Sequence, residues 1–107
     1  MNHPEIDIDE LERHLAGGSP VFDVREHDEY ASVHIPGAVL VPLATVPDAV
    51  ERFPSDETIY VVCAKGGRSA KAVQFLRDRG IDAVNVAGGT GAWAGAGKPT
   101  VAGNQPA

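Results

Sequence analysis

The segment YVVCAKGGRSAK, residues 60–71, holds the only cysteine of the chain, Cys63, in front of a loop with Lys65 and Arg68. An apolar run precedes the cysteine and a helical pattern begins near Ser69, which predicts that Cys63 ends a parallel strand beside a helix N-terminus. Backbone N–H groups around the two loop glycines can form an anion-binding nest. With the two cations, these groups should lower the pKa of Cys63 and make its thiolate a nucleophile.

Packing offers a different interpretation of Cys63, because free cysteine is among the most buried residue types. The cations and glycines between strand and helix favour a reactive site instead. The loop lacks the Gly-Lys-Ser/Thr order of a nucleotide P-loop, which argues against nucleotide hydrolysis. A single cysteine cannot form an internal disulfide, so its chemistry must end on another molecule. The four histidines and the cysteine lack zinc-site spacing, and we expect neither a metal nor a cofactor.

Composition limits the class of protein. The chain has 107 residues, enough for one domain with one core. A net charge of −6 argues against general binding to nucleic acid or to an anionic membrane. The N-terminus has no basic and apolar leader, and no apolar run reaches transmembrane length, so we expect a cytoplasmic protein.

Apolar runs alternate with helical patterns along the chain, which is typical of an α/β protein with a parallel sheet. Strands are predicted in PVFDVR, AVLVPL, TIYVVC and DAVNVAGG, and helices in DIDELERHLAGG, EHDEYASV, PDAVERF, SAKAVQFLRDRG and GAWAGAG. The first helix should have Asp7 or Asp9 as its N-cap. Trp93 is expected to fill the core, and residues 100–107 are predicted to be a flexible tail.

Four segments of the chain, taken in sequence order, resemble motifs of the rhodanese-like sulfurtransferase family. DVREHDEY (23–30) is similar to the family's D-x-R-x-x-x-E-[FY], HIPGA (34–38) to its second signature, CAKGGRS (63–69) to its active loop, and VAGGTGAW...GKP to its ending. The resemblance spans residues 6–99, about the expected core. It implies one rhodanese-like domain over residues 1–107, with a central parallel sheet of about five strands flanked by helices, and a cysteine that carries sulfane sulfur as a persulfide.

Two positions depart from the family pattern. The family usually has glycine where this chain has Val33, and a left-handed helix cap there would strain a valine. Thr90 and Gly91 stand where the family often has a larger residue, which affects the expected packing near Trp93.

The number of residues in the loop distinguishes sulfur from phosphorus chemistry. Cysteine-dependent phosphatases resemble C-x5-R, whereas Cys63 to Arg68 is C-x4-R, and the tighter loop favours a bound sulfur over a phosphoryl group. The resemblance therefore implies a thiosulfate sulfurtransferase with Cys63 as nucleophile. Substrate-binding roles are expected for the rest of the loop, which comprises Ala64, Lys65, Gly66, Gly67, Arg68 and Ser69. For Ser69 a cap on the following helix is favoured over a direct contact with the substrate.

Asp23 and Arg25 resemble the family's supporting pair and are expected to brace the loop. The expected partners are a small sulfur donor and a cyanide or thiol acceptor, with a protein acceptor as an alternative. Two other functions remain open, a non-enzymatic rhodanese-like interaction module and a phosphatase or arsenate reductase. The physiological donor, the acceptor and the oligomeric state do not follow from the sequence.

Overall fold

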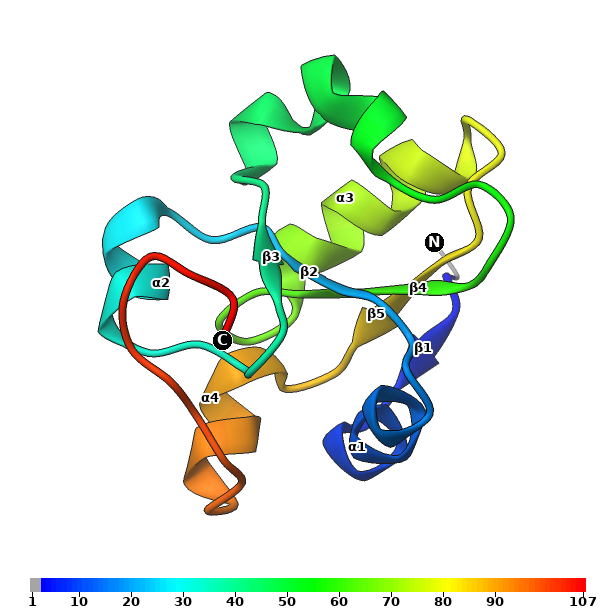
Figure 1. The fold of residues 1–107 in the computed structure, drawn as a ribbon. Helices are drawn as coiled ribbons and strands as arrows, with labels where there is room; N and C mark the ends of the chain where they lie inside the picture. Colours follow the sequence, from blue (N-terminus) through cyan, green and yellow to red (C-terminus); the bar gives the residue numbers. More distant parts are fainter. Residues whose placement is uncertain (1–2) are drawn as a thin grey trace.

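A five-stranded parallel sheet forms the centre of the protein in a computed structural model that describes residues 3–107 (Figure 1). The strand order is β1-β5-β4-β2-β3, and each neighbouring pair is parallel. The strands are β1 (Glu5–Ile6), β2 (Val21–Asp23), β3 (Val39–Leu40), β4 (Ile59–Val62) and β5 (Ala83–Val86). The α/β class and the parallel sheet are confirmed. The two residues of β1 were not predicted, because they are too few to show a strand period.

Helices cover both faces of the sheet (Figure 1). They are α1 (Ile8–Ala16), α2 (His27–Ser32), the 3-10 helix η1 (Leu43–Arg52), α3 (Gly67–Arg77) and α4 (Gly89–Gly95). Apolar residues of η1 and α3 pack on one face, whereas those of α1, α2 and α4 pack on the other. Within residues 3–107, we find no helix with the length and apolar character needed to cross a bilayer.

Strand β4 shows why this sequence forms a central strand. Ile59 and Val61 belong to the core on the α3 side, and Tyr60 and Val62 to the core on the α1 side. Side chains alternate across a strand, so a strand between two helical layers must be apolar at every position. This arrangement puts the residue after β4, Cys63, at the carboxyl edge of the sheet.

The ends of the first two helices settle two expectations. Asp7 caps α1, because its Oδ1 accepts the Glu10 N–H at 2.8 Å. The Glu10 carboxylate in turn accepts the Asp7 N–H, which completes a capping box. Helix α2 ends at Ser32, and Val33 follows with a φ of −164°, which is extended backbone. The strain expected at Val33 is therefore absent, because no left-handed cap is formed there.

The end of the chain differs from the flexible tail predicted from its small, polar residues. Val101 forms an antiparallel bridge with the buried His34, and the Gly103 N–H donates to the Ala31 carbonyl at 2.8 Å. The Gly37 N–H donates to the Pro106 carbonyl at 2.8 Å. The tail is held because it satisfies backbone groups of α2 and the following turn, and these partners lie far away in the sequence.

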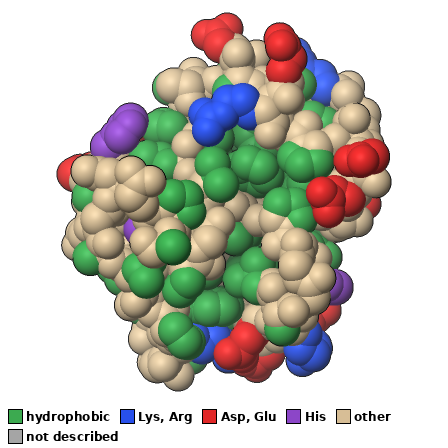
Figure 2. Space-filling model, in the orientation of Figure 1, with side chains coloured by type: hydrophobic (Ala, Val, Ile, Leu, Met, Phe, Trp, Pro, Cys, Tyr) green, Lys and Arg blue, Asp and Glu red, His purple; other side chains and the backbone are tan. Residues whose placement is uncertain are grey.

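A surface pocket of about 340 Å³ lies beside the tail, and its lining includes Leu40, Arg52 and Asn104. None of its lining residues comes from the Cys63 loop. Figure 2 shows this side of the molecule, with apolar side chains gathered in the middle and charged side chains mostly near the margin.

Candidate active site

Cys63 is the first residue of the loop that joins β4 to α3. The side chain is a free thiol and the residue is only 1% exposed. Its Sγ accepts the Gly66 N–H at 3.0 Å and the Ser69 hydroxyl at 3.3 Å. The loop therefore wraps around the sulfur and offers it hydrogen-bond donors, as an anion-binding loop does.

The surroundings of Cys63 act on its pKa in opposite directions. Burial raises the pKa, while hydrogen bonds from the Ser69 side chain and backbone, and from the Gly66 and Lys65 backbones, lower it. The combined effect of the hydrogen bonds is larger than that of burial, and the pKa of Cys63 lies below the ordinary thiol value. This is the direction that the sequence predicted, and it increases the thiolate fraction at neutral pH.

Ser69 does not cap α3, contrary to the prediction. The helix begins at Gly67, and Gly66 occupies the N-cap with a φ of 116°, a left-handed conformation that favours glycine. Ser69 therefore lies within the first turn, where it is fully buried and its hydroxyl points at the sulfur. Its short side chain therefore donates a hydrogen bond to the Cys63 sulfur and not to the backbone of the helix.

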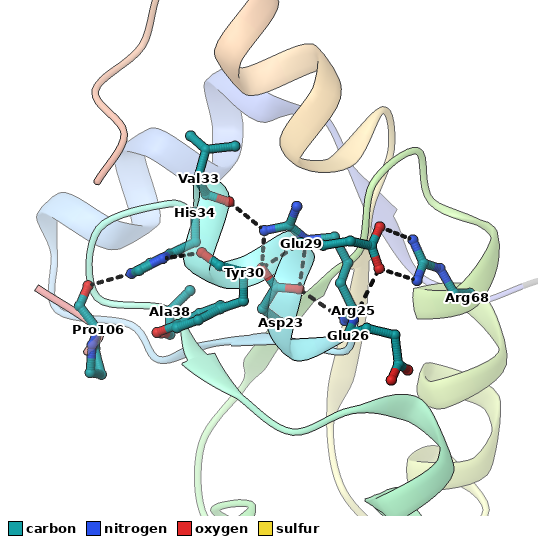
Figure 3. A network of polar contacts seen from close by, with 10 residues as sticks. All are labelled: Asp23, Arg25, Glu26, Glu29, Tyr30, Val33, His34, Ala38, Arg68 and Pro106. Atoms are coloured by element: carbon teal, nitrogen blue, oxygen red, sulfur yellow. Dashed lines mark hydrogen bonds and ion pairs between the residues drawn. The ribbon is translucent and has the colours of Figure 1, made fainter. Parts of the chain in front are cut away.

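The two loop cations have different environments. Lys65 is exposed at the loop. Arg68 forms two parallel hydrogen bonds with the Glu29 carboxylate of α2, at 2.7 and 2.8 Å (Figure 3). We expected both cations to attract and orient an anionic donor, but Arg68 is engaged by Glu29, and Lys65 is the exposed cation of the pair.

Glu29 is part of this site although the sequence assigned it no role. The hydrogen bonds from Arg68, and then the N–H of Glu26, lower the pKa of Glu29 to about 2. Glu29 is therefore a carboxylate at neutral pH, and its ion pair with Arg68 joins α2 to the start of α3. The only sequence signal was its place in the DVREHDEY motif.

Asp23 and Arg25 form a buried pair at the end of β2. The Asp23 carboxylate accepts the backbone N–H, the Nε and the Nη2 of Arg25 at distances between 2.8 and 3.1 Å. Arg25 Nη2 also donates to the Val33 carbonyl at 2.7 Å (Figure 3). The side-chain hydrogen bonds of this pair thus reach the end of α2, the helix that carries Glu29.

The other side of the loop is held by hydrogen bonds that α4 and β5 donate to its carbonyl groups. The Thr90 N–H donates to the Cys63 carbonyl at 2.8 Å, and the Gly91 N–H donates to the Ala64 carbonyl at 2.9 Å. The Asn85 side chain donates to the Gly66 carbonyl at 3.2 Å. Small residues at the start of α4 let this helix approach the loop closely, and the buried Trp93 follows one turn later, in the core as predicted.

Comparison with known proteins places this geometry in a family. The model of the rhodanese-like domain matches residues 7–96. A sulfurtransferase from Allochromatium vinosum is 36% identical over 101 residues, which cover 92% of this chain and 94% of that protein. A chloroplastic thiosulfate sulfurtransferase from Arabidopsis thaliana is also 36% identical over 101 residues, with 82% and 84% covered. A putative sulfur carrier protein from Bacillus subtilis is longer, and the match spans 51% of it.

Solved structures agree with this match. A rhodanese-like domain protein from Staphylococcus aureus is 45% identical and superposes with a TM-score of 0.81, over 85% of this chain and 91% of that one. A human single-domain sulfurtransferase is 30% identical with a TM-score of 0.79, over 88% and 97% of the two chains. The relatives support sulfur transfer as the general activity.

Proposed function

Because the chain belongs to the rhodanese-like domain family, we propose that it is a thiosulfate-type sulfurtransferase that carries the transferred sulfur as a persulfide on Cys63. The observation that best supports this proposal is the position of the Cys63 sulfur, which accepts the Gly66 N–H and the Ser69 hydroxyl. The same preorganised donors can stabilise a thiolate before the transfer and an anionic persulfide after it.

In the first step, the Cys63 thiolate attacks the outer sulfur of thiosulfate. A sulfur–sulfur bond forms at Sγ, the original sulfur–sulfur bond of the donor breaks, and sulfite leaves with the electron pair of that bond. No proton is transferred, because the nucleophile is already deprotonated. A lowered Cys63 pKa is the property that this step requires.

In the second step, cyanide or a thiolate attacks the outer sulfur of the persulfide. The new bond gives thiocyanate or an acceptor persulfide, and the electron pair of the broken bond returns to Cys63 as the thiolate. The enzyme is restored without a metal or an external oxidant. Chemistry of this ping-pong kind suits a chain with a single cysteine, since the sulfur is passed to a second molecule.

The shape of the Cys63 loop favours a small sulfur donor. Cys63 is only 1% exposed, so the sulfur to be transferred has to be a terminal atom. The loop from Cys63 to Arg68 is C-x4-R, which leaves less room for a phosphoryl group than C-x5-R would. Lys65 is exposed in the same loop and can attract an anionic donor such as thiosulfate.

Intact-mass measurement after exposure to thiosulfate tests the proposal. The protein is expected to gain the mass of one sulfur atom, located on Cys63 by peptide mapping, and to lose it when cyanide is added. Protein whose Cys63 has first been alkylated serves as the control and should gain nothing. A thiosulfate-treated protein that carries no added sulfur would contradict the proposal and favour an interaction module.

Replacing Glu29 with glutamine should weaken sulfur transfer. The amide keeps the shape of the side chain but cannot form the charge-assisted pair with Arg68, which then loses its fixed orientation. Both side chains are about one-third exposed, so we expect a moderate effect, a fall of roughly fivefold in kcat/KM for thiosulfate.

Asp28→Asn is the matched control for Glu29→Gln, because Asp28 is exposed on the same helix and the change in net charge is the same. Its kcat/KM should stay close to that of the wild type. Equal losses in the two variants would mean that net charge, and not the Arg68 contact, is responsible.

A further inference from the structure

Asn85 is a buried polar residue in the middle of the sheet. It lies on β5, whose neighbours in the sheet are β1 and β4, and it is only 1% exposed. The other residues of this strand, Ala83, Val84 and Val86, are apolar and belong to the two cores. A polar side chain in such a place costs free energy unless hydrogen bonds satisfy it, so its partners should explain why it is there.

The nitrogen of the Asn85 side chain has two acceptors. Its Nδ2 donates to the Glu5 carboxylate of β1 at 2.9 Å and to the Gly66 carbonyl of the Cys63 loop at 3.2 Å. A side-chain amide nitrogen carries two hydrogens, so it can make both bonds at once. The Oδ1 of Asn85, in contrast, is buried and has no hydrogen-bond partner among residues 3–107. The contribution of Asn85 therefore comes from its donors.

Gly66 connects this amide to the sulfur of Cys63. Its C=O accepts the bond from Asn85, and its own N–H donates to Cys63 Sγ at 3.0 Å. Glycine has more backbone freedom than any other residue, so hydrogen bonds have to fix the direction of this N–H. The Ala70 N–H supplies one bond to the Gly66 C=O from within α3, at 3.1 Å. Asn85 supplies a second bond from the sheet.

We propose that Asn85 is a positioning residue, whose side-chain amide holds the Gly66 carbonyl so that the Gly66 N–H stays directed at the Cys63 sulfur. The proposal rests on the proposed function, since it concerns how that nucleophile is prepared. The hydrogen bonds described for Sγ come from the loop and from the start of α3, so Asn85 acts through Gly66 and not on the sulfur itself.

The substitution Asn85→Leu tests the proposal, because it removes both donors and leaves a side chain of similar size. Leucine suits a buried strand between two cores, and the unpartnered Oδ1 is removed as well. The Glu5 side chain is 48% exposed and can bind water instead, while the Gly66 C=O keeps the Ala70 N–H. We therefore expect the variant to fold, with a melting temperature near that of the wild type.

The charged groups near Cys63 are the same in Asn85→Leu and in the wild type. They are Lys65 and Arg68 in the loop, Glu29 on α2, the Asp23–Arg25 pair at the end of β2, and Glu5 on β1, which reaches the loop through Asn85. Because the Asn85 amide carries no charge, a change in the titration of Cys63 in this variant reports the lost hydrogen bonds and not a lost charge.

The rate of Cys63 alkylation by iodoacetamide is measured as a function of pH. The hydrogen bond from the Gly66 N–H lowers the pKa of Cys63, so an N–H that no longer points at the sulfur leaves that pKa higher. We expect the midpoint for Asn85→Leu to move to higher pH and its alkylation rate at neutral pH to fall several-fold. Activity with thiosulfate should fall at neutral pH and recover as the pH is raised.

Val84→Ala is the matched control for Asn85→Leu. Val84 precedes Asn85 on β5, and its side chain packs in the core on the α1 side, on the opposite face of the strand. The control variant should have a lower melting temperature, because it loses buried methyl groups, while its Cys63 titrates like that of the wild type. Equal shifts of the midpoint in the two variants would overturn the proposal, since looser packing of β5 would then explain both.

An unchanged midpoint in Asn85→Leu would also overturn the proposal. Alkylation needs no sulfur donor, so this result is separate from a failure of the proposed sulfur transfer. A second measurement uses the wild type and does not depend on how a variant folds. The side-chain NH2 protons of Asn85, followed by NMR, should shift with the same midpoint as the Cys63 thiol, because Gly66 joins the two groups. The NH2 protons of Gln74, which donates to Asp78, are the reference, and Asn85 protons that respond no more than these would contradict the proposal.

Discussion

Replacing Cys63 with serine is expected to abolish sulfur transfer and leave the fold intact. A serine hydroxyl stays protonated at neutral pH, so the loop would no longer contain an anionic nucleophile, and no persulfide could form. The rate of thiocyanate production from thiosulfate and cyanide should fall by roughly a thousandfold or more. Because Sγ is bound by the Gly66 N–H and the Ser69 hydroxyl, the serine oxygen can take over as their acceptor.

The melting temperature of the Cys63→Ser variant is the control for this experiment and should remain near that of the wild type. Thiosulfate:cyanide activity that survives the substitution would rule out Cys63 as the nucleophile. Aryl phosphate or arsenate turnover by the wild type, lost on Cys63→Ser, would instead point to the alternative chemistry of a loop that binds a tetrahedral anion.

Replacing Asp23 with alanine is expected to lower the free energy of unfolding by about 3–5 kcal/mol, the usual cost of breaking a buried ion pair. Asp23 is 0% exposed and Arg25 is 4% exposed. Without the Asp23 carboxylate, the guanidinium of Arg25 would stay buried and would keep only its hydrogen bond to the Val33 carbonyl. Urea denaturation measures the loss, which is a large share of the 5–15 kcal/mol typical of small domains.

Asp82→Ala is the matched control for Asp23→Ala. Asp82 also pairs with an arginine, Arg77, but the two side chains are 56% and 37% exposed. An exposed pair contributes about 1 kcal/mol or less, so this variant should stay close to the wild type. Equal losses in the two variants would contradict a special role for the buried pair. A double variant with apolar residues at Asp23 and Arg25 should regain part of the stability.

The local pattern of residues was enough to predict the class of the fold and the place of Cys63 at the end of a strand. The apolar run before Cys63, the glycines and cations after it and the helical pattern from Ser69 predicted a strand, a loop and a helix in the right order. Such signals are short-range, because they depend on side-chain alternation, turn residues and helical spacing. They also predicted that the loop would lower the Cys63 pKa.

Contacts between distant segments had no such signal. The sequence placed Ser69 at the N-cap and left Arg68 free for substrate. The observed N-cap is Gly66, three residues earlier, so Ser69 lies within α3 with its hydroxyl on the sulfur. Arg68 and its partner Glu29 are 39 residues apart, and only packing of α2 against the loop brings them together.

The sequence by itself therefore determined the βα architecture and the position of Cys63 and of the loop that follows it. Only the tertiary structure decided which groups hold that loop: Glu29 from α2, which binds Arg68, and the first turn of α4, which binds the Cys63 and Ala64 carbonyls. The physical reason is that many groups along a chain could pair with a given hydrogen-bond donor or carboxylate. Which partner it meets depends on close approach between elements, as where a Cβ on Gly89 would collide with the Cys63 carbonyl oxygen.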